Sequence, residues 1–585
     1  MSMIAQYAVL AVYFLGPLVF VILVYRFNSH PLNKFPGPAL ARFTDGYAGF
    51  HAAQRRLHLV TYRDHQTYGP IVRQGPNRLV FNTVTALHDI YLSQRVTKSK
   101  VYLKSLLSTN RPSMFNALDR EEHSHKRRVV GQLITERSMR LFEPTMARQI
   151  DVFLRQLLAS GQKNEIVNMT TRCQQLGADV VGLLAFGYEL KTQTEDTNKI
   201  IPAAMKSTSY RISLYMAWPN ISIVDPVIRW FGRKQIPKFY QELRKMIGRR
   251  ISMPKDSAHD LYAVASGDVT PSGDKGLQGT DLWSEASFFV MAGGMTVSTL
   301  MSAVFFYLTR HQEVYARLAT EIRTTFDSGM AIASGPKLIS CRYLRAVIDE
   351  TMRVAPPTTA TPWREDDIYS AIPPRSDGPL VVDGHIIPRG VAVGVSLYSI
   401  LHNEAYFPEP FTFRPERWLD VEEVKDGAFD KEAQATMRRA FVPFALGDRA
   451  CAGKAMAYLE TSLTIAKTLW YFDFETAPGE AGRVGGGTPG RTDGRDRVDE
   501  YQLYDIFTAD HDGPNVVLKP RAEVLDELNM SNLPLFINDD VDSSHLLDEL
   551  DKEPDSLTLE RPSELPNEPF KALENKVWAA EAMVR

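Results

Sequence analysis

Apolar residues repeating every three and four positions predict that the middle of this chain is mostly helical. The pattern is strongest over Glu136–Leu158 and Leu282–Phe326, and it extends with interruptions from about residue 50 to about residue 360. A polar segment rich in Gly, Ser and Asp, Lys255–Thr280, predicts a surface loop before the second run. Around Leu380–Val395 the period changes to two, and Asp383-Gly384 at its centre predicts a β-hairpin.

The N-terminal segment predicts a membrane anchor. Tyr7–Tyr25 contains no charged residue, and a helix of this length spans roughly 28 Å, close to the thickness of a bilayer core. Positive charge follows at Arg26, Lys34 and Arg42, which places that side in the cytoplasm. We therefore expect residues 1–29 to be an uncleaved anchor, with a buried core helix as the alternative.

Two further segments flank the expected body. The proline-rich stretch His30–Pro38 predicts a stiff extended spacer. From Ala522 onward there are 16 acidic and 5 basic residues, so residues 522–585 are expected to form a disordered acidic tail. The rest of the chain then carries a net charge of about +9, although the whole chain is at −2. A basic body could attract an acidic partner, and an evenly solvated surface is the equal alternative.

The three cysteines are too few and too scattered for a disulfide framework. Cys173 and Cys341 are expected to be small buried residues. Cys451 differs, because it follows Arg449 by two residues and directly precedes a helix-compatible run, Lys454–Trp470. A helix N-terminus, a guanidinium group and free backbone N–H groups all favour a thiolate. Cys451 is therefore a candidate metal ligand.

The spacing Phe-x-x-Gly-x-Arg-x-Cys-x-Gly, from Phe444 to Gly453, resembles the haem-binding loop of the cytochrome P-450 family. The pattern continues through Ala457 and Glu460. The resemblance covers residues 30–521 and implies a cytochrome P-450 catalytic domain, mainly α with small β-sheets. It also implies that Cys451 is the axial iron ligand of haem b, that Gly453 belongs to the cofactor loop and that Phe444 packs beside it.

Glu350-Thr-Met-Arg353, followed by Pro-Glu-Arg417-Trp, resembles the structural triad of the same family. A Glu and an Arg three positions apart share one helix face and can pair. A second arginine can complete a buried bidentate network. The role that the resemblance implies for Glu350, Arg353 and Arg417 is structural: they hold the segment that places the cysteine loop.

Within an apolar run, Ala292-Gly-Gly-Met-Thr296 resembles the distal helix of the family. Glycines weaken a helix and are kept where it bends or is closely approached, so Gly293 and Thr296 are candidate catalytic positions. A packing glycine in a core helix is the alternative. The position before the threonine is usually acidic in the family and is Met295 here. This departure puts the usual carboxylate relay in doubt, and leaves water, Thr296 or the substrate to supply protons.

Haem propionates need basic partners. By position in the family motifs these are Arg449, Arg364 and Arg127, with His123 as a weaker candidate. The alternative for the segment from His123 to Arg128 is a solvated basic turn.

The resemblance implies a monooxygenase that uses dioxygen and receives electrons from NADPH through NADPH–cytochrome P-450 reductase, with cytochrome b5 as a further candidate donor. The anchor implies the endoplasmic reticulum membrane, and no nucleic-acid partner is expected. Apolar residues near Phe288, Phe289 and Ala292 suggest a lipophilic substrate, in the style of fungal secondary metabolism. A haem-thiolate isomerase or dehydratase, which Met295 mildly favours, and a non-catalytic haem-binding membrane protein, which the acidic tail suggests, remain open.

Overall fold

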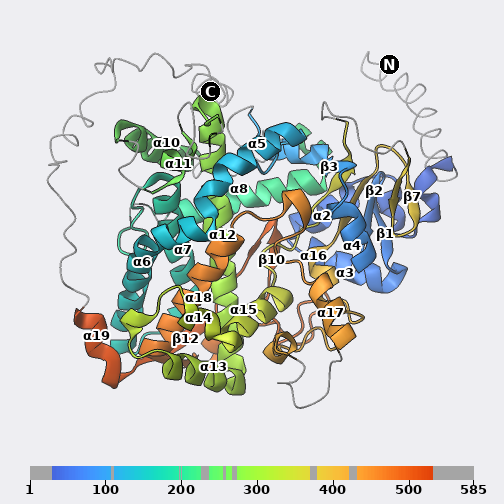
Figure 1. Cartoon of the computed structure of the whole chain (residues 1–585). Coiled ribbons are helices and arrows are strands. Elements are labelled where there is room, and N and C mark those ends of the chain that lie inside the picture. Colours follow the sequence, from blue (N-terminus) through green and yellow to red (C-terminus); the bar gives the residue numbers. More distant parts are fainter. Residues whose placement is uncertain are drawn as a thin grey trace, which may run out of the picture.

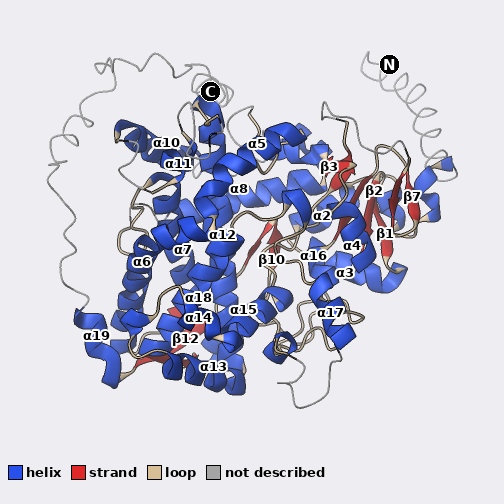
Figure 2. Cartoon of the chain, in the orientation of Figure 1, coloured by secondary structure: helices blue, strands red, loops and turns tan. Residues whose placement is uncertain are grey.

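The computed structural model describes residues 29–106, 111–196, 198, 200–224, 236–254, 259–266, 273, 275–368, 378–420 and 431–530. The predicted anchor, apart from Ser29, and residues 531–585 lie outside this part of the chain. The described residues form a helix-rich body with small β-sheets, and β1, β2 and β3 lie at the right of the view in Figures 1 and 2. This confirms the mainly α prediction.

A long central helix, α12 (Gly279–Arg310), is the axis of the helical core (Figure 1). It packs against α7 (Met169–Phe186), α15 (Arg342–Val354) and α18 (Lys454–Tyr471). The contact with α7 is close because both helices carry glycine there. A Cβ on Gly177 would lie 2.6 Å from the carbonyl oxygen of Gly294, and one on Gly293 would lie 2.8 Å from a methyl carbon of Val181.

The remaining described helices surround this core. They are α2 (Gly46–Ala53), α3 (Leu57–Tyr68), α4 (Val84–Tyr91), α5 (Arg120–Gly131), α6 (Glu136–Gln162), α8 (Ile200–Ala217), α10 (Ile236–Ser252), α11 (Leu261–Ala265), α13 (Gln312–Thr325), α14 (Pro336–Ser340), α16 (Leu397–Leu401), α17 (Lys431–Ala440) and α19 (Leu525–Met530). The predicted run Glu136–Leu158 corresponds to α6. The predicted run Leu282–Phe326 is two helices, because the backbone leaves helical geometry at His311 (φ −120°, ψ 82°).

Within the described residues, α12 is the helix long and apolar enough to cross a bilayer. Its most apolar window is 72% buried inside the protein. We therefore interpret it as a core helix.

The main sheet has five strands in the order β1-β2-β8-β5-β3. The strands are β1 (Ile71–Gly75), β2 (Arg78–Phe81), β3 (Val96–Lys98), β5 (Arg364–Asp366) and β8 (Ala392–Val395). The predicted hairpin over Leu380–Val395 is formed by β6 (Leu380–Val382) and β7 (His385–Ile387), with Asp383 and Gly384 at positive φ in the turn. The last part of the predicted hairpin, Ala392–Val395, is instead the separate strand β8, which pairs in parallel with β2.

Two smaller sheets come from the C-terminal part of the body. β10 (Tyr504–Ile506) and β11 (Thr508–Asp510) form a hairpin. β12 (Asn515–Pro520) pairs with β4 (Val167–Asn168) and β9 (Phe472–Thr476).

Both flanks of the body are packed. Pro31–Lys34 is a 3₁₀ helix, Leu32 is fully buried, and the Arg73 N–H donates to the Pro36 carbonyl, so this segment is part of the body and not a free extended spacer. At the other end, the Gly329 N–H donates to the Glu527 carboxylate at 2.7 Å and Leu528 is buried. The packed chain therefore continues through α19, nine residues beyond Arg521.

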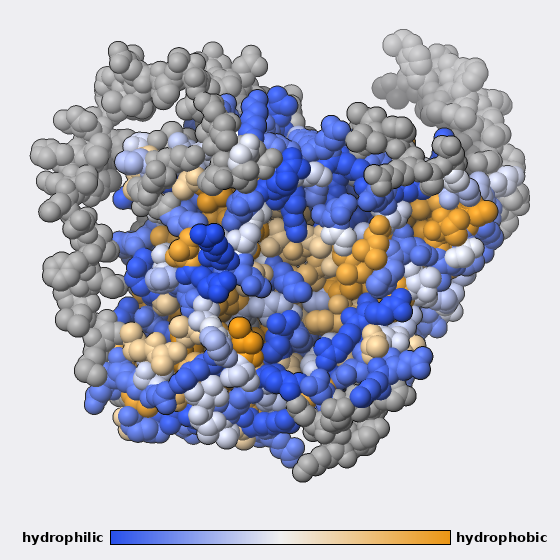
Figure 3. All heavy atoms as spheres, viewed as in Figure 1, coloured by the Kyte–Doolittle hydropathy of each residue, from blue (hydrophilic) through white to orange (hydrophobic). Residues whose placement is uncertain are grey.

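The surface in Figure 3 is mostly hydrophilic, with an apolar patch in the region of the β6–β7 hairpin. Val381 (46% exposed) and Ile386 (58% exposed) lie on this hairpin.

Candidate active site

The loop that carries Cys451 is closed by backbone hydrogen bonds. The Cys451 N–H donates to the Phe444 carbonyl at 2.8 Å, and the Ala450 N–H donates to the Gly447 carbonyl at 2.9 Å. Gly447 has φ +72°, and a Cβ there would lie 2.1 Å from the carbonyl oxygen of Tyr91, so the position requires glycine. Gly453 is the N-cap of α18, which directs the N-terminus of that helix towards the cysteine.

The pKa of Cys451 is shifted in the direction opposite to the sequence-based expectation. Cys451 is exposed, whereas Cys173 and Cys341 are buried, as predicted. Even so, desolvation raises the pKa of the Cys451 thiol, and the Gly453 N–H and Arg127 only partly offset it. The predicted backbone donor is present as the Gly453 N–H, whereas the guanidinium that acts on the thiol belongs to Arg127, where the sequence had indicated Arg449. Coordination to a metal would supply the remaining drive to deprotonation.

Five basic side chains gather near the cysteine loop, on β3, α5, β5 and the 3₁₀ turn Gly447–Arg449: Lys98, His123, Arg127, Arg364 and Arg449. Lys98 and Arg364 are directly paired across β3 and β5, an arrangement that like charges normally disfavour. Burial lowers the pKa of Lys98 well below its usual value, and the three arginines lower it further. Burial and the surrounding cations likewise lower the pKa of His123 to about 2.

Main-chain carbonyls hold these cations in place. Arg449 donates to the Ala117 carbonyl at 2.6 Å, Arg127 donates to the Ala450 carbonyl at 2.6 Å, and Lys98 donates to the Phe115 carbonyl. Such a buried concentration of positive charge is suited to an anionic ligand. Beside a cysteine at a helix N-terminus, it fits the two propionates of haem.

Sequence reasoning identified four of these five residues and missed Lys98. Lys98 lies in a strand of three residues, and its relation to the other four follows from strand pairing between distant parts of the chain. No motif spacing in the sequence could have indicated it.

The residues of the predicted triad meet and are fully buried. Arg353 donates to both carboxylate oxygens of Glu350, at 2.7 and 2.8 Å, and Arg417 donates to one of them at 3.3 Å. Burial would raise the pKa of Glu350, but the two arginines outweigh it and the pKa is lowered. Arg353 also donates to the carbonyls of Leu401, Pro410 and Thr412, so the network ties α15 to the segment that leads to the cysteine loop.

On α12, a strip of side chains is only partly buried within an otherwise buried helix: Phe288, Phe289, Ala292, Gly293 and Thr296. The Thr296 hydroxyl donates to the Ala292 carbonyl at 2.7 Å. The helix remains regular through this segment, and Gly293 lies against Val181 of α7. These contacts give Gly293 a packing role.

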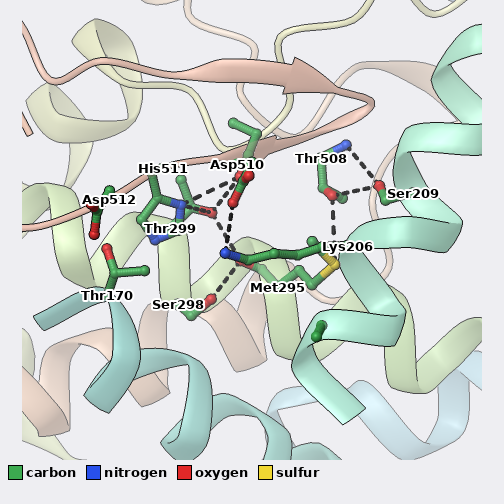
Figure 4. Close-up of polar contacts among 12 residues, drawn as sticks. Thr170, Lys206, Ser209, Met295, Ser298, Thr299, Thr508, Asp510, His511 and Asp512 are labelled. Atoms are coloured by element: carbon green, nitrogen blue, oxygen red, sulfur yellow. Dashed lines mark hydrogen bonds and ion pairs between the residues drawn. The ribbon is translucent and has the colours of Figure 1, made fainter. Parts of the chain in front are cut away.

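Met295 faces a different set of partners (Figure 4). Its sulfur receives a long contact from the Thr508 hydroxyl at 3.7 Å, and Thr508 is hydrogen bonded to Ser209 at 2.7 Å. The ionic pair at this face joins Lys206 of α8 to Asp510 of β11 at 2.8 Å. The β10–β11 hairpin and α8 therefore supply the polar groups around the position where the family usually has an acid.

Two cavities lie beside these elements. The first is bordered by α3, α8, residues 359–363 and Phe507. The second is smaller and lies between α12, α8 and residues 105–116. Phe507 borders the first, and its ring lies 5.2 Å from that of Phe115, which borders the second. Aromatic side chains therefore separate the two.

Comparison with known proteins agrees with this geometry. The family model for cytochrome P-450 matches residues 38–484. The chain is 33% identical to the cytochrome P-450 monooxygenase AKT7 of Alternaria alternata over 522 residues, 87% of this chain and 97% of that protein. It is 30% identical to poxM of Penicillium oxalicum (89% and 96%) and 32% identical to atnE of Emericella nidulans (86% and 95%), which carry the same description. The chain belongs to the cytochrome P-450 family.

Proposed function

We propose that the protein is a haem-thiolate monooxygenase in which Cys451 is the axial ligand of haem b. The observation that carries this proposal is the placement of Cys451 in a glycine-dependent loop beside five basic residues, of which Lys98, His123 and Arg364 are buried. Haem, when bound, supplies the activation of dioxygen and the transfer of one oxygen atom to a substrate. The protein's part is to bind and orient both molecules and to exclude water.

The basic residues would hold the propionates: Lys98, His123, Arg127, Arg364 and Arg449. Phe444 is half-buried and lies 5.4 Å from Tyr458, so it would shield the sulfur from water. Gly453 is the N-cap of α18, and its N–H is hydrogen bonded to the sulfur, which would stabilise the thiolate. Glu350, Arg353 and Arg417 act at a distance by fixing the segment before the loop.

Proton delivery is assigned to the Thr296 hydroxyl and to water, because Met295 offers no carboxylate. Thr296 lies on the partly exposed strip of α12, which supports this role. The test uses the haem-loaded protein with NADPH–cytochrome P-450 reductase and measures the fraction of consumed NADPH recovered as hydrogen peroxide. Thr296→Ala should raise this fraction. Thr309→Ala is the matched control, since Thr309 makes a similar bond to a helix carbonyl at a fully packed part of α12. An unchanged fraction in Thr296→Ala would remove Thr296 from proton delivery.

Electrons would come from NADPH through that reductase, with cytochrome b5 as a second donor. Residues 1–29 would anchor the protein in the endoplasmic reticulum membrane, with residues 30–521 cytosolic and residues 522–585 mostly a tail. The exposed apolar side chains of Val381 and Ile386 on the β6–β7 hairpin support contact with a membrane. The fungal relatives support a small-molecule substrate from fungal secondary metabolism.

A haem-thiolate isomerase or dehydratase is the second candidate, and Met295 is the observation that favours it. Turnover of a substrate without dioxygen and without reductase would establish this alternative. NADPH consumption coupled to product formation would exclude it.

A further inference from the structure

Residues 111–118 form a segment between α12 and the basic residues near the cysteine loop. Lys98 donates to the Phe115 carbonyl, and Arg449 donates to the Ala117 carbonyl at 2.6 Å. Lys98 has three N–H donors and Arg449 has five, so each can keep its carbonyl and still bind an anion. The segment therefore helps to orient two of the side chains that would hold the propionates.

Glu285 of α12 anchors the segment from the other side. It is 2% exposed, and its Oε1 accepts a hydrogen bond from the Met114 N–H at 2.7 Å. Lys126 of α5 donates to the Pro112 carbonyl of the same segment. A buried N–H without an acceptor destabilises the structure around it. The bond from Met114 to Glu285 therefore fixes the segment against α12.

The segment passes the position of Met114 on to the two carbonyls because it forms a closed turn. The Asn116 N–H and the Ala117 N–H both donate to the Ser113 carbonyl, at 3.0 and 2.9 Å. The side chain of Asn116 in turn accepts from the Ser113 N–H at 2.7 Å. A shift of Met114 would therefore move the carbonyls of Phe115 and Ala117 with it.

The hydrogen bond from Met114 ties Glu285 more closely than its ion pair does. Lys126 lies 3.1 Å from Glu122 and 3.3 Å from Asp281, but 3.7 Å from Glu285. Burial raises the pKa of Glu285 to about 7, and Lys126 only partly offsets this shift. An oxygen of Glu285 can accept the Met114 N–H in either protonation state. The segment therefore depends on the reach of this side chain and not on its charge.

We propose that Glu285 is a positioning residue of the haem site, which fixes Lys98 and Arg449 by holding the Met114 N–H. This inference rests on the proposed function, because it concerns the side chains that would hold the propionates. Glu285 lies on α12 and acts on these side chains through residues 111–118. It thus links the helix of the distal side to the residues that anchor the cofactor.

The test separates the reach of residue 285 from its charge. Glu285→Asp keeps the negative charge but is one methylene shorter, so it should withdraw the acceptor from the Met114 N–H. Glu285→Gln loses the charge but keeps an oxygen at the same reach, and Lys126 and Met114 both approach Oε1. The haem-loaded, full-length protein is mixed with excess apomyoglobin, and the rate of haem transfer is followed by absorbance. Glu285→Asp should transfer haem about tenfold faster than the native protein, as the loss of one hydrogen bond predicts. Glu285→Gln should transfer it no faster than the native protein.

Glu122→Asp is the matched control. Glu122 also pairs with Lys126 and loses the same methylene, but its side chain is 35% exposed on α5. This variant should transfer haem at the native rate.

Hydrogen exchange of the peptide that covers residues 111–118, measured by mass spectrometry, is a readout that needs no haem. Exchange should be faster in Glu285→Asp and unchanged in Glu285→Gln. A native rate of haem transfer in Glu285→Asp, or equally fast transfer in both variants, would overturn the proposal, as would unchanged exchange in Glu285→Asp. A native protein that binds no haem would instead refute the proposed function, and the exchange measurement would still test the contact between Glu285 and Met114.

Discussion

Replacing Glu350 by glutamine removes the carboxylate that holds two fully buried arginines. Its Oε1 accepts from Arg353 Nη2, the Arg414 N–H and Arg417 Nε at 2.7, 2.9 and 3.3 Å. Its Oε2 accepts from Arg353 Nε at 2.8 Å and from Trp418 Nε1 at 3.0 Å. Glutamine keeps one acceptor oxygen, and its amide nitrogen would face two donors.

The expected cost follows from these contacts. A buried donor left without an acceptor costs about 1–3 kcal/mol. Breaking a buried ion pair by removing one charge costs about 3–5 kcal/mol in all, because the other charge stays buried. We therefore expect Glu350→Gln to lower the free energy of unfolding by about 3–5 kcal/mol.

The assay is urea unfolding of the full chain, followed by tryptophan fluorescence. Asp420→Asn is the matched control from the same segment, because Asp420 pairs with Arg342 at the surface at 2.6 Å. Such an exposed pair is worth about 0–1 kcal/mol. If Glu350→Gln costs no more than Asp420→Asn, the triad does not stabilise the fold as described.

Three further outcomes are expected. Gly447→Ala should prevent the cysteine loop from closing and so reduce haem incorporation. Gly390 is also at positive φ but has open space around it, so Gly390→Ala should lower the free energy of unfolding by only about 1 kcal/mol. Equal effects of the two variants on haem content would contradict the close approach of Gly447 to Tyr91. Removal of residues 531–585 should leave the thermal unfolding midpoint and haem binding unchanged. Removal of residues 522–585 should lower the midpoint, because the buried Leu528 and the contact of Glu527 with Gly329 are lost. Equal midpoints for the two truncated proteins would show that α19 does not stabilise the body. Burial raises the pKa of Glu460 from 4.5 to about 8, so its protonated form stabilises the fold at low pH and this contribution is lost as pH rises towards about 8. Glu460→Gln should therefore flatten this part of the plot of the thermal unfolding midpoint against pH. An unchanged slope would show that Glu460 is not neutral in the fold.

The parts of the site that could be predicted are those encoded by local spacing. The cysteine loop and the Glu350–Arg353 pair each lie within ten residues of chain, so their geometry follows from helix and turn rules. The long helices were also predictable, because a single amphipathic or apolar pattern covers each one. The break at His311 was missed since the apolar pattern continues across it.

Features that depend on distant pairing could not be predicted. Lys98 joins the basic cluster through the pairing of β3 with β5, and β8 leaves the hairpin pattern to pair with β2. The net pKa shift of Cys451 depends on how much protein surrounds the thiol, and local donors alone predicted the opposite direction.

Axial ligation of haem by Cys451 is tested most directly by the absorbance difference spectrum of the reduced, full-length protein with and without carbon monoxide. We expect the band typical of thiolate-ligated haem in the native protein and in Cys341→Ala, and its absence in Cys451→Ala. A normal thiolate band in Cys451→Ala, or none in the native protein loaded with haem, would contradict it.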